Sequence, residues 1–195
     1  MKEIAIWWIG ASGVAADLLE AIRRRVAGEF GLPVGAHLSA ERPEGTLDPR
    51  RGQHSSTKIL RWLSEHRPAS ADRVLAVTDA DLFIPILTFV FGEAQLKGRA
   101  AVVSTARLAG DGLVVPDPAR FRARVVTECV HELGHTFGLL HCQSTRCAMA
   151  RSPGLREVDA KIETLCPACR ERYLELATEN GENNEQEEHP HSGRR

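Results

Sequence analysis

Hydrophobic and polar positions along roughly the first hundred residues follow two alternating periods, which predict strands interleaved with helices. The run from Glu3 to Ile9 is short and almost wholly apolar, as is typical of a buried strand. Ser12 to Phe30 repeats its apolar residues at helical spacing, and a glycine and a proline follow where this helix should end. Leu32 to Ser39 is predicted to be a second strand. We therefore expect the helix to cover one face of a sheet.

The middle of the chain continues this alternation after one polar interruption. Ala40 to Gln53 is dense in proline, glycine and charge, so it is predicted to be an exposed loop. Ser55 or Ser56 can cap a helix that runs to His66, and Arg73 to Thr78 is predicted to be a buried strand.

Two further extended runs, Leu87 to Glu93 and Ala100 to Ser104, flank a turn signal at Lys97 and Gly98. This pattern predicts a hairpin or a neighbouring edge strand. By contrast, the apolar residues from Ala119 to Phe137 recur at steps of four, which predicts a helix with one buried face.

The end of the chain has a different composition. Residues 180–195 contain almost no apolar side chain, so they are predicted to form a disordered tail. Residues 1–179 are expected to form a single domain, with an N-terminal subdomain at about 1–138 and a C-terminal subdomain at about 139–179.

Composition and charge exclude several classes of function. Hydrophobic residues make up 43% and charged residues 26% of the 195 positions, which is ordinary for a soluble enzyme. The formal net charge of -1 offers no electrostatic footprint for nucleic acid. No segment has the roughly 18 apolar residues that a membrane span needs, and the amino end does not resemble a signal peptide. We expect a cytoplasmic protein that binds neither nucleic acid nor membranes.

A histidine motif lies near the end of the last predicted helix. His131 and His135 are one helical turn apart, so both imidazoles can converge on one ion. Glu132 is rotated by one residue step and can reach a water on that ion, which suits a general base. A catalytic zinc needs a third ligand and an open position, and His141 follows a helix end at Gly138, where glycine can turn the chain back.

This motif predicts a zinc site that performs metal-assisted hydrolysis. A chance occurrence of its pattern has a probability on the order of 10⁻⁴, so coincidence is a poor explanation. One alternative is a zinc-stabilised binding or regulatory module without turnover, although Glu132 then has little structural reason to be present. Another is a zinc amidase that acts on a non-peptide amide.

Four of the five cysteines form two close pairs in the last third of the chain. They are Cys142 with Cys147, and Cys166 with Cys169. Four thiolates can hold a closed structural zinc, and free thiols or two disulfides are the alternatives. Because Cys142 directly follows His141, we expect the two metal sites to be coupled. Cys129 lies on the apolar helix stripe and is predicted to be a core thiol.

The run HELGHTFGLLHCQSTRCAM, followed by CPAC, resembles the archaemetzincins, a family of the metzincin zinc peptidases. The resemblance covers about residues 121–170, and its loop between Met149 and Cys166 is one residue shorter than the family pattern. It implies a peptidase with two zinc ions (Zn²⁺) per chain, one catalytic and one structural, with Glu132 as base and Met149 under the catalytic metal. The implied ligands are His131, His135 and His141 for the first ion and Cys142, Cys147, Cys166 and Cys169 for the second.

These observations predict an α+β, metzincin-like fold: a twisted mixed sheet with helices, an active-site helix and a small zinc-bound C-terminal subdomain. The expected function is hydrolysis of peptide bonds in peptide or protein substrates. By analogy with the family, an edge strand above the active-site helix pairs with an extended substrate, and Leu87 to Glu93 is the candidate.

The remaining aromatic and titratable residues receive no functional role. Trp7, Trp8 and Trp62 are expected to be packing residues, and Asp79 with Asp81 are expected to lie in a solvated turn. The other histidines lack partner spacing and are expected on the surface or in the core; they are His37, His54, His66, His189 and His191.

Overall fold

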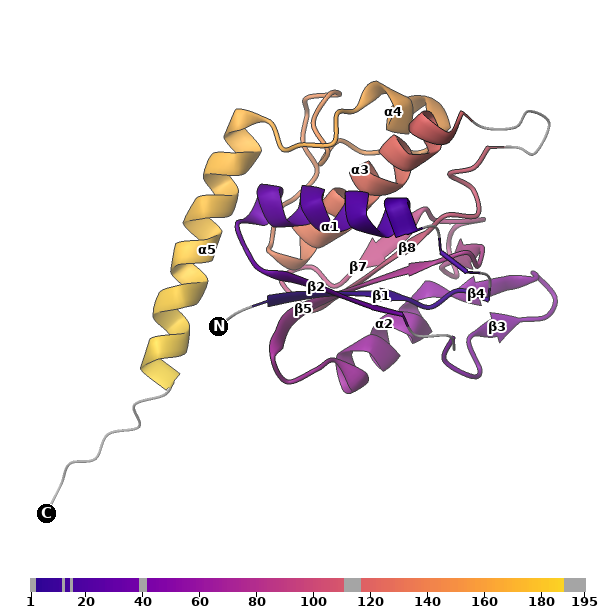
Figure 1. Cartoon of the computed structure of the whole chain (residues 1–195), viewed down its shortest axis with the longest axis horizontal. Helices are drawn as coiled ribbons and strands as arrows, with labels where there is room; N and C mark the ends of the chain where they lie inside the picture. Colours follow the sequence, from indigo (N-terminus) through magenta and orange to yellow (C-terminus); the bar gives the residue numbers. More distant parts are fainter. Residues whose placement is uncertain (1–2, 12, 15, 39–41, 111–116, 188–195) are drawn as a thin grey trace, which may run out of the picture.

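A five-stranded mixed sheet runs through the centre of the computed structural model (Figure 1). The structure describes residues 3–11, 13–14, 16–38, 42–110 and 117–187, the last eight by their backbone alone. The sheet order is β2-β1-β5-β8-β7, and only the edge strand β7 is antiparallel to its neighbour. The strands are β1 (Glu3–Trp8), β2 (Val34–Leu38), β5 (Ala71–Thr78), β7 (Gly92–Ala94) and β8 (Ala100–Ser104).

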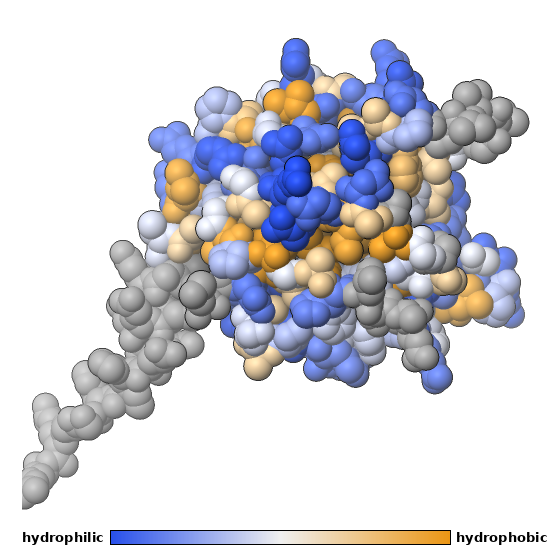
Figure 2. All heavy atoms as spheres, in the orientation of Figure 1, coloured by the Kyte–Doolittle hydropathy of each residue, from blue (hydrophilic) through white to orange (hydrophobic). Residues whose placement is uncertain are grey.

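Helices cover both faces of this sheet. On one face lie α1 (Ala16–Phe30) and α3 (Pro118–Thr136), and on the other lies α2 (Ser56–His66) (Figure 1). Successive residues of β1 contribute alternately to two hydrophobic clusters, one shared with α1 and α3 and one shared with α2. The outward face of α1 is hydrophilic in Figure 2, as its amphipathic pattern predicts.

The helix boundaries agree with their sequence signals. Ser55 caps α2, where its Oγ accepts a hydrogen bond from the Lys58 N–H at 3.4 Å. Asp117 caps α3, and Pro118 occupies the first turn, where no N–H donor is needed.

The segment predicted as an exposed loop, Ala40 to Gln53, is partly a second sheet, so that prediction was wrong. Strands β3 (Leu47–Asp48), β4 (Gln53–Ser55) and β6 (Leu82–Phe83) form a small sheet of order β3-β4-β6. Gln53 is buried, and its Nε2 donates to Asp81 Oδ2 at 2.9 Å and to the Thr88 carbonyl at 3.0 Å. The burial is stabilised by hydrogen bonds between polar groups, which hydrophobic periodicity does not reveal.

The predicted edge strand, Leu87 to Glu93, is also displaced. The hairpin at Lys97 and Gly98 exists, but its first strand is the short β7, Gly92–Ala94. Ile86 and Leu87 are exposed, and Val90 makes only an isolated bridge to Leu82. The apolar run reads as a strand because its side chains line a cleft, described below, instead of packing in the sheet.

The carboxyl end contains α4 (Leu155–Ala160) and a long helix, α5 (Pro167–Glu187). Tyr173 joins α5 to the end of α1, because its hydroxyl donates to the Phe30 carbonyl at 2.6 Å. The helix continues beyond Asn180 to residue 187, whereas the sequence predicts a disordered tail from 180; residues 188–195 lie outside the described residues. Within the described chain, no helix is long and apolar enough to cross a membrane.

Most residues without a predicted role have structural partners. Trp7 meets Trp62 edge to face with ring centroids 5.6 Å apart, and Trp8 is buried. The turn with Asp79 and Asp81 is less solvated than expected, because the two carboxylates pair with Arg42 and Arg107.

The other histidines take ordinary surroundings where the structure describes them. The His54 ring nitrogen Nδ1 lies 2.8 Å from Thr46 Oγ1, His66 stacks on Trp62, and His37 lies in β2. The positions of His189 and His191 fall outside the described residues.

Candidate metal centres and active site

Helix α3 brings the first two histidines together. The predicted stripe faces the core: Val125, Cys129 and Leu133 are fully buried. On another face of the helix, His131 and His135 point their Nε2 atoms toward each other across 3.1 Å. The spacing of one turn therefore produces the convergence that the sequence predicts.

His141 joins them because the chain turns sharply after α3. Gly138 has a backbone φ of +99°, a conformation that residues with a Cβ rarely adopt. The Gly138 N–H donates to the His135 carbonyl at 2.9 Å, which closes the helix end. The ligand-type nitrogens of His131, His135 and His141 all lie within 4.8 Å of one another.

Backbone carbonyls orient two of the three imidazoles. The Nδ1 of His131 lies 2.8 Å from the Ala148 oxygen, and the Nδ1 of His135 lies 2.8 Å from the Leu139 oxygen. Each Nδ1 therefore carries the proton and donates it, which leaves Nε2 as a lone-pair donor. These two nitrogens and a ring nitrogen of His141, with no fourth ligand in the group among the described residues, fit a catalytic zinc with an open position.

Burial lowers the pKa of all three histidines, most strongly that of His131. Charged neighbours add to the effect: Lys161 acts on all three rings, and Arg151 acts on His141. Neutral imidazoles are the form that binds a metal, so protons compete weakly for these nitrogens at neutral pH.

Glu132 is buried beside this cluster. Its pKa is raised well above the usual value by burial first and by Glu128 next, while Lys161 acts in the opposite direction. The side chain lies against Gly92 of β7: an added Cβ there would be 2.6 Å from Glu132 Cγ and 2.7 Å from the Val102 oxygen. The strand can approach the helix so closely only because position 92 has no side chain.

Gly92→Ala is expected to move the Glu132 carboxylate and to lower kcat for peptide hydrolysis about 10²-fold, the typical cost of a misplacement of about 1 Å. Gly35→Ala is the matched control, because a Cβ there would meet its nearest neighbour at an ordinary 3.5 Å. Steady-state kinetics with metal analysis of both variants provide the measurement. Equal kcat values for the two variants would contradict the role of Gly92.

Met149 is fully buried under α3, where Gly134 makes room for it. A Cβ at position 134 would lie 2.4 Å from Met149 Sδ. The methionine therefore packs directly against the turn of helix that carries both histidines. Neither Gly92 nor Gly134 was identified from the sequence, since what they accommodate comes from distant segments.

The four paired cysteines form a second cluster. Their sulfur atoms lie within 4.8 Å of one another, and none of the five cysteines forms a disulfide in this structure. Cys142 Sγ and Cys166 Sγ are 3.7 Å apart, and backbone N–H groups of Ser144 and Cys166 point at Cys142 Sγ and Cys147 Sγ. Cys129, as predicted, is buried in the core away from this cluster.

The pKa values of Cys147, Cys166 and Cys169 are shifted in different directions. Burial raises the pKa of Cys147 and of Cys169. Burial acts on Cys166 in the same way, but the Cys169 N–H and neighbouring thiols outweigh it, and the Cys166 pKa is lowered. A cluster of sulfur atoms without an open position matches a closed tetrahedral zinc site.

One residue joins the two clusters through its backbone. The Ala148 N–H donates to the Thr164 carbonyl at 3.0 Å, and the Ala148 carbonyl accepts from His131 Nδ1. Ala148 directly follows Cys147, and Thr164 lies two residues before Cys166. The loop that the cysteines hold therefore orients a histidine of the other cluster.

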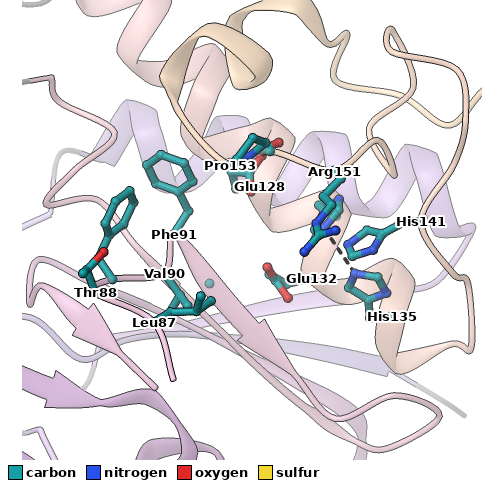
Figure 3. A pocket seen from close by; sticks show the side chains of 14 residues that line it. Leu87, Thr88, Val90, Phe91, Glu128, Glu132, His135, His141, Arg151 and Pro153 are labelled. Atoms are coloured by element: carbon teal, nitrogen blue, oxygen red, sulfur yellow. Dashed lines mark hydrogen bonds between the residues drawn. The ribbon is translucent and has the colours of Figure 1, made fainter. Parts of the chain in front are cut away.

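An open cleft of about 580 Å³ passes over the histidines (Figure 3). The segment from Leu87 to Gly92 forms one wall, and the residues 151–153 that follow the Met149 region form part of the other. Figure 3 shows Glu132 between Val90 and His135.

A buried ion pair supports this cleft, and the sequence analysis missed it. Glu128 lines the cleft, and its Oε1 accepts from Lys161 Nζ at 3.0 Å; the two side chains are 3% and 0% exposed. Glu128 lies one turn before Glu132, which is the only signal that could have suggested it.

Comparison with known proteins places this site in a known family. Residues 14–175 match the model described as "Peptidase family M54". The archaemetzincin of Methanopyrus kandleri is 38% identical over 171 residues, which span 88% of this chain and 94% of that protein. Its crystal structure covers 90% of this chain and 96% of its own with a TM-score of 0.79 at 34% identity. The structure of a zinc-dependent peptidase from Methanocorpusculum labreanum matches with a TM-score of 0.75 at 30% identity. The match covers 87% of this chain and 99% of that one.

The mixed sheet, the active-site helix and the histidine cluster define a metzincin-like zinc metallopeptidase. More narrowly, the chain belongs to peptidase family M54, that of the archaemetzincins.

Proposed function

We propose that this chain hydrolyses peptide bonds at the histidine cluster, with His131, His135 and His141 as zinc ligands and Glu132 as general base. The observation that carries the proposal is the convergence of three imidazole nitrogens beside one buried carboxylate in an open cleft. A zinc ion held there would lower the pKa of a bound water to about 7. The same ion would polarise the scissile carbonyl.

The residues of the chain perform the proton transfers. Glu132 accepts a proton from the attacking water and returns it to the leaving amine. Its raised pKa supports this role, because a carboxylate in these surroundings holds a proton more readily than an exposed one. Gly92 positions it by letting β7 lie against its side chain.

The substrate is a peptide or protein chain, and β7 is the element best placed to align it. Among the described strands, β7 lies at the edge of the main sheet and pairs with β8 on one side alone. An extended peptide can add to the other side through backbone hydrogen bonds. The substrate-pairing strand is therefore proposed to be Gly92–Ala94, in place of the predicted Leu87 to Glu93.

A second zinc ion, held by the four paired cysteines, is proposed to be structural, so that each chain carries two. Met149 and Gly138 then have supporting roles, the first by packing under α3 and the second by turning the chain toward His141. The domain proposal remains a single domain over 1–179 with two subdomains that meet near residue 138, where α3 has ended.

Metal analysis of the purified chain tests this function. The protein is expected to contain two zinc ions, to lose peptide hydrolysis when a chelator removes the histidine-bound ion, and to regain it when zinc is added. Mass spectrometry of a diverse peptide library measures the hydrolysis. One zinc per chain with a histidine site that stays empty after zinc addition would favour the binding or regulatory module instead. Cleavage confined to non-peptide amides would favour the amidase.

A further inference from the structure

Besides the three histidines, three charged side chains line the cleft, and two of them already have a partner or a role. Glu128 pairs with the buried Lys161 Nζ at 3.0 Å, so its charge is compensated inside the protein. Glu132 is the proposed proton acceptor. Arg151 is the third, and neither the ion pair nor the hydrolysis mechanism uses it.

Arg151 lies two residues after Met149, in the wall of the cleft opposite Leu87 and Val90. The side chain is exposed, and among the described residues no hydrogen bond or ion pair engages its guanidinium. Figure 3 shows it extending over the cleft from the side of His141.

The chemistry of this group selects its ligand. A guanidinium presents N–H donors in a planar fork that matches the two oxygens of a carboxylate. The facing wall is mostly apolar, formed by Leu87, Phe89, Val90 and Phe91, so a bound substrate excludes water from the pair and strengthens it. A neutral amide at the same place accepts at most an uncharged hydrogen bond from Arg151, and a basic side chain is repelled by it.

We propose that Arg151 is a specificity-determining residue that binds a carboxylate of the substrate beside the scissile bond. The enzyme then prefers peptides with an acidic side chain at one position of the cleft, or with a free C-terminal carboxylate there. This inference rests on the proposed function, because it assigns the substrate class of the same site.

A binding experiment tests it without turnover. The full chain is loaded with zinc and carries Glu132→Gln, which prevents cleavage. The probes are fluorescent alanine-rich octapeptides with Glu, Gln or Lys at each position in turn. Glu is expected to bind about tenfold more tightly than Gln at one position, the effect of about 1.4 kcal/mol. Arg151→Gln should abolish this difference, and Arg151→Glu should reverse it in favour of the Lys peptide.

The two sources of the carboxylate are separated by a further pair of probes. Alanine-rich peptides of decreasing length are compared as free acids and as C-terminal amides. If the ligand is the C-terminal carboxylate, the free acid binds more tightly at one length and the internal Glu has no effect. Arg151→Lys is expected to recover part of the preference, since it keeps the charge and loses the fork.

Arg156→Gln is the matched control, because Arg156 is an exposed arginine five residues further along, in α4, and does not line the cleft. It should keep the full Glu-to-Gln ratio. The proposal would be overturned if Arg151→Gln left the Glu-to-Gln affinity ratio unchanged. It would also be overturned if Arg151→Gln, made without Glu132→Gln, lowered kcat equally for all peptides. Because binding is measured in the Glu132→Gln background, the result does not depend on whether the wild-type chain hydrolyses peptides.

Discussion

Replacing Glu132 with glutamine is expected to lower kcat for peptide hydrolysis by about 10²–10⁴-fold, the usual contribution of a general base. Glutamine keeps the size of the side chain and its contact with Gly92, but it cannot accept the proton of the attacking water. Both metal centres should stay loaded, because Glu132 is not among the clustered ligand atoms. Steady-state kinetics and zinc analysis on the same preparation give the two measurements.

Two further variants make this result interpretable. Glu132→Ala removes the carboxylate and the volume together, and it is expected to lose at least as much activity. Glu171→Gln changes the same chemistry on the exposed face of α5 and should behave as the wild type. Near-normal kcat in Glu132→Gln with the histidine zinc in place would rule out the proposed base.

Cys166→Ser is expected to remove the second zinc and to weaken zinc binding at the histidines by about 10–100-fold, the range found when a group that orients a ligand is lost. No atom of the histidine cluster is changed by this substitution. The effect travels through the loop that contains Ala148, whose carbonyl accepts from His131 Nδ1 and whose N–H donates to Thr164.

Competition with a zinc-binding dye measures both affinities, and circular dichroism reports the melting temperature. The melting temperature should fall further in Cys166→Ser than in Glu132→Gln, since a closed zinc site contributes directly to folding. A folded Cys166→Ser protein with unchanged zinc affinity at the histidines would show that the two centres are independent.

Local periodicity predicted the parts of the site that one helix and its end determine. His131 and His135 meet because they are one turn apart, and Gly138 marks the turn that returns the chain toward them. The strands β1, β5 and β8 were found in the same way, because most of their residues are buried on both faces of the sheet.

Contacts between segments far apart in the sequence could not be predicted from local periodicity. Glu128 and Lys161 are 33 positions apart and look like ordinary surface charges in the sequence, yet both are buried. The run from Leu87 to Val90 has the hydrophobicity of a strand, but its apolar side chains form a cleft wall. Gly92 and Gly134 have no unusual φ angle, so only the tertiary structure reveals why they lack a side chain.

The closeness of Gly92 to Glu132 has a consequence for accuracy of cleavage. A peptide that pairs with β7 would take its register from the same strand that packs against Glu132, the proposed base. Thermal bending of that strand would carry the substrate and the proton acceptor along together, so their separation would vary less than the position of either. A scaffold designed to tolerate a mobile substrate could copy this arrangement.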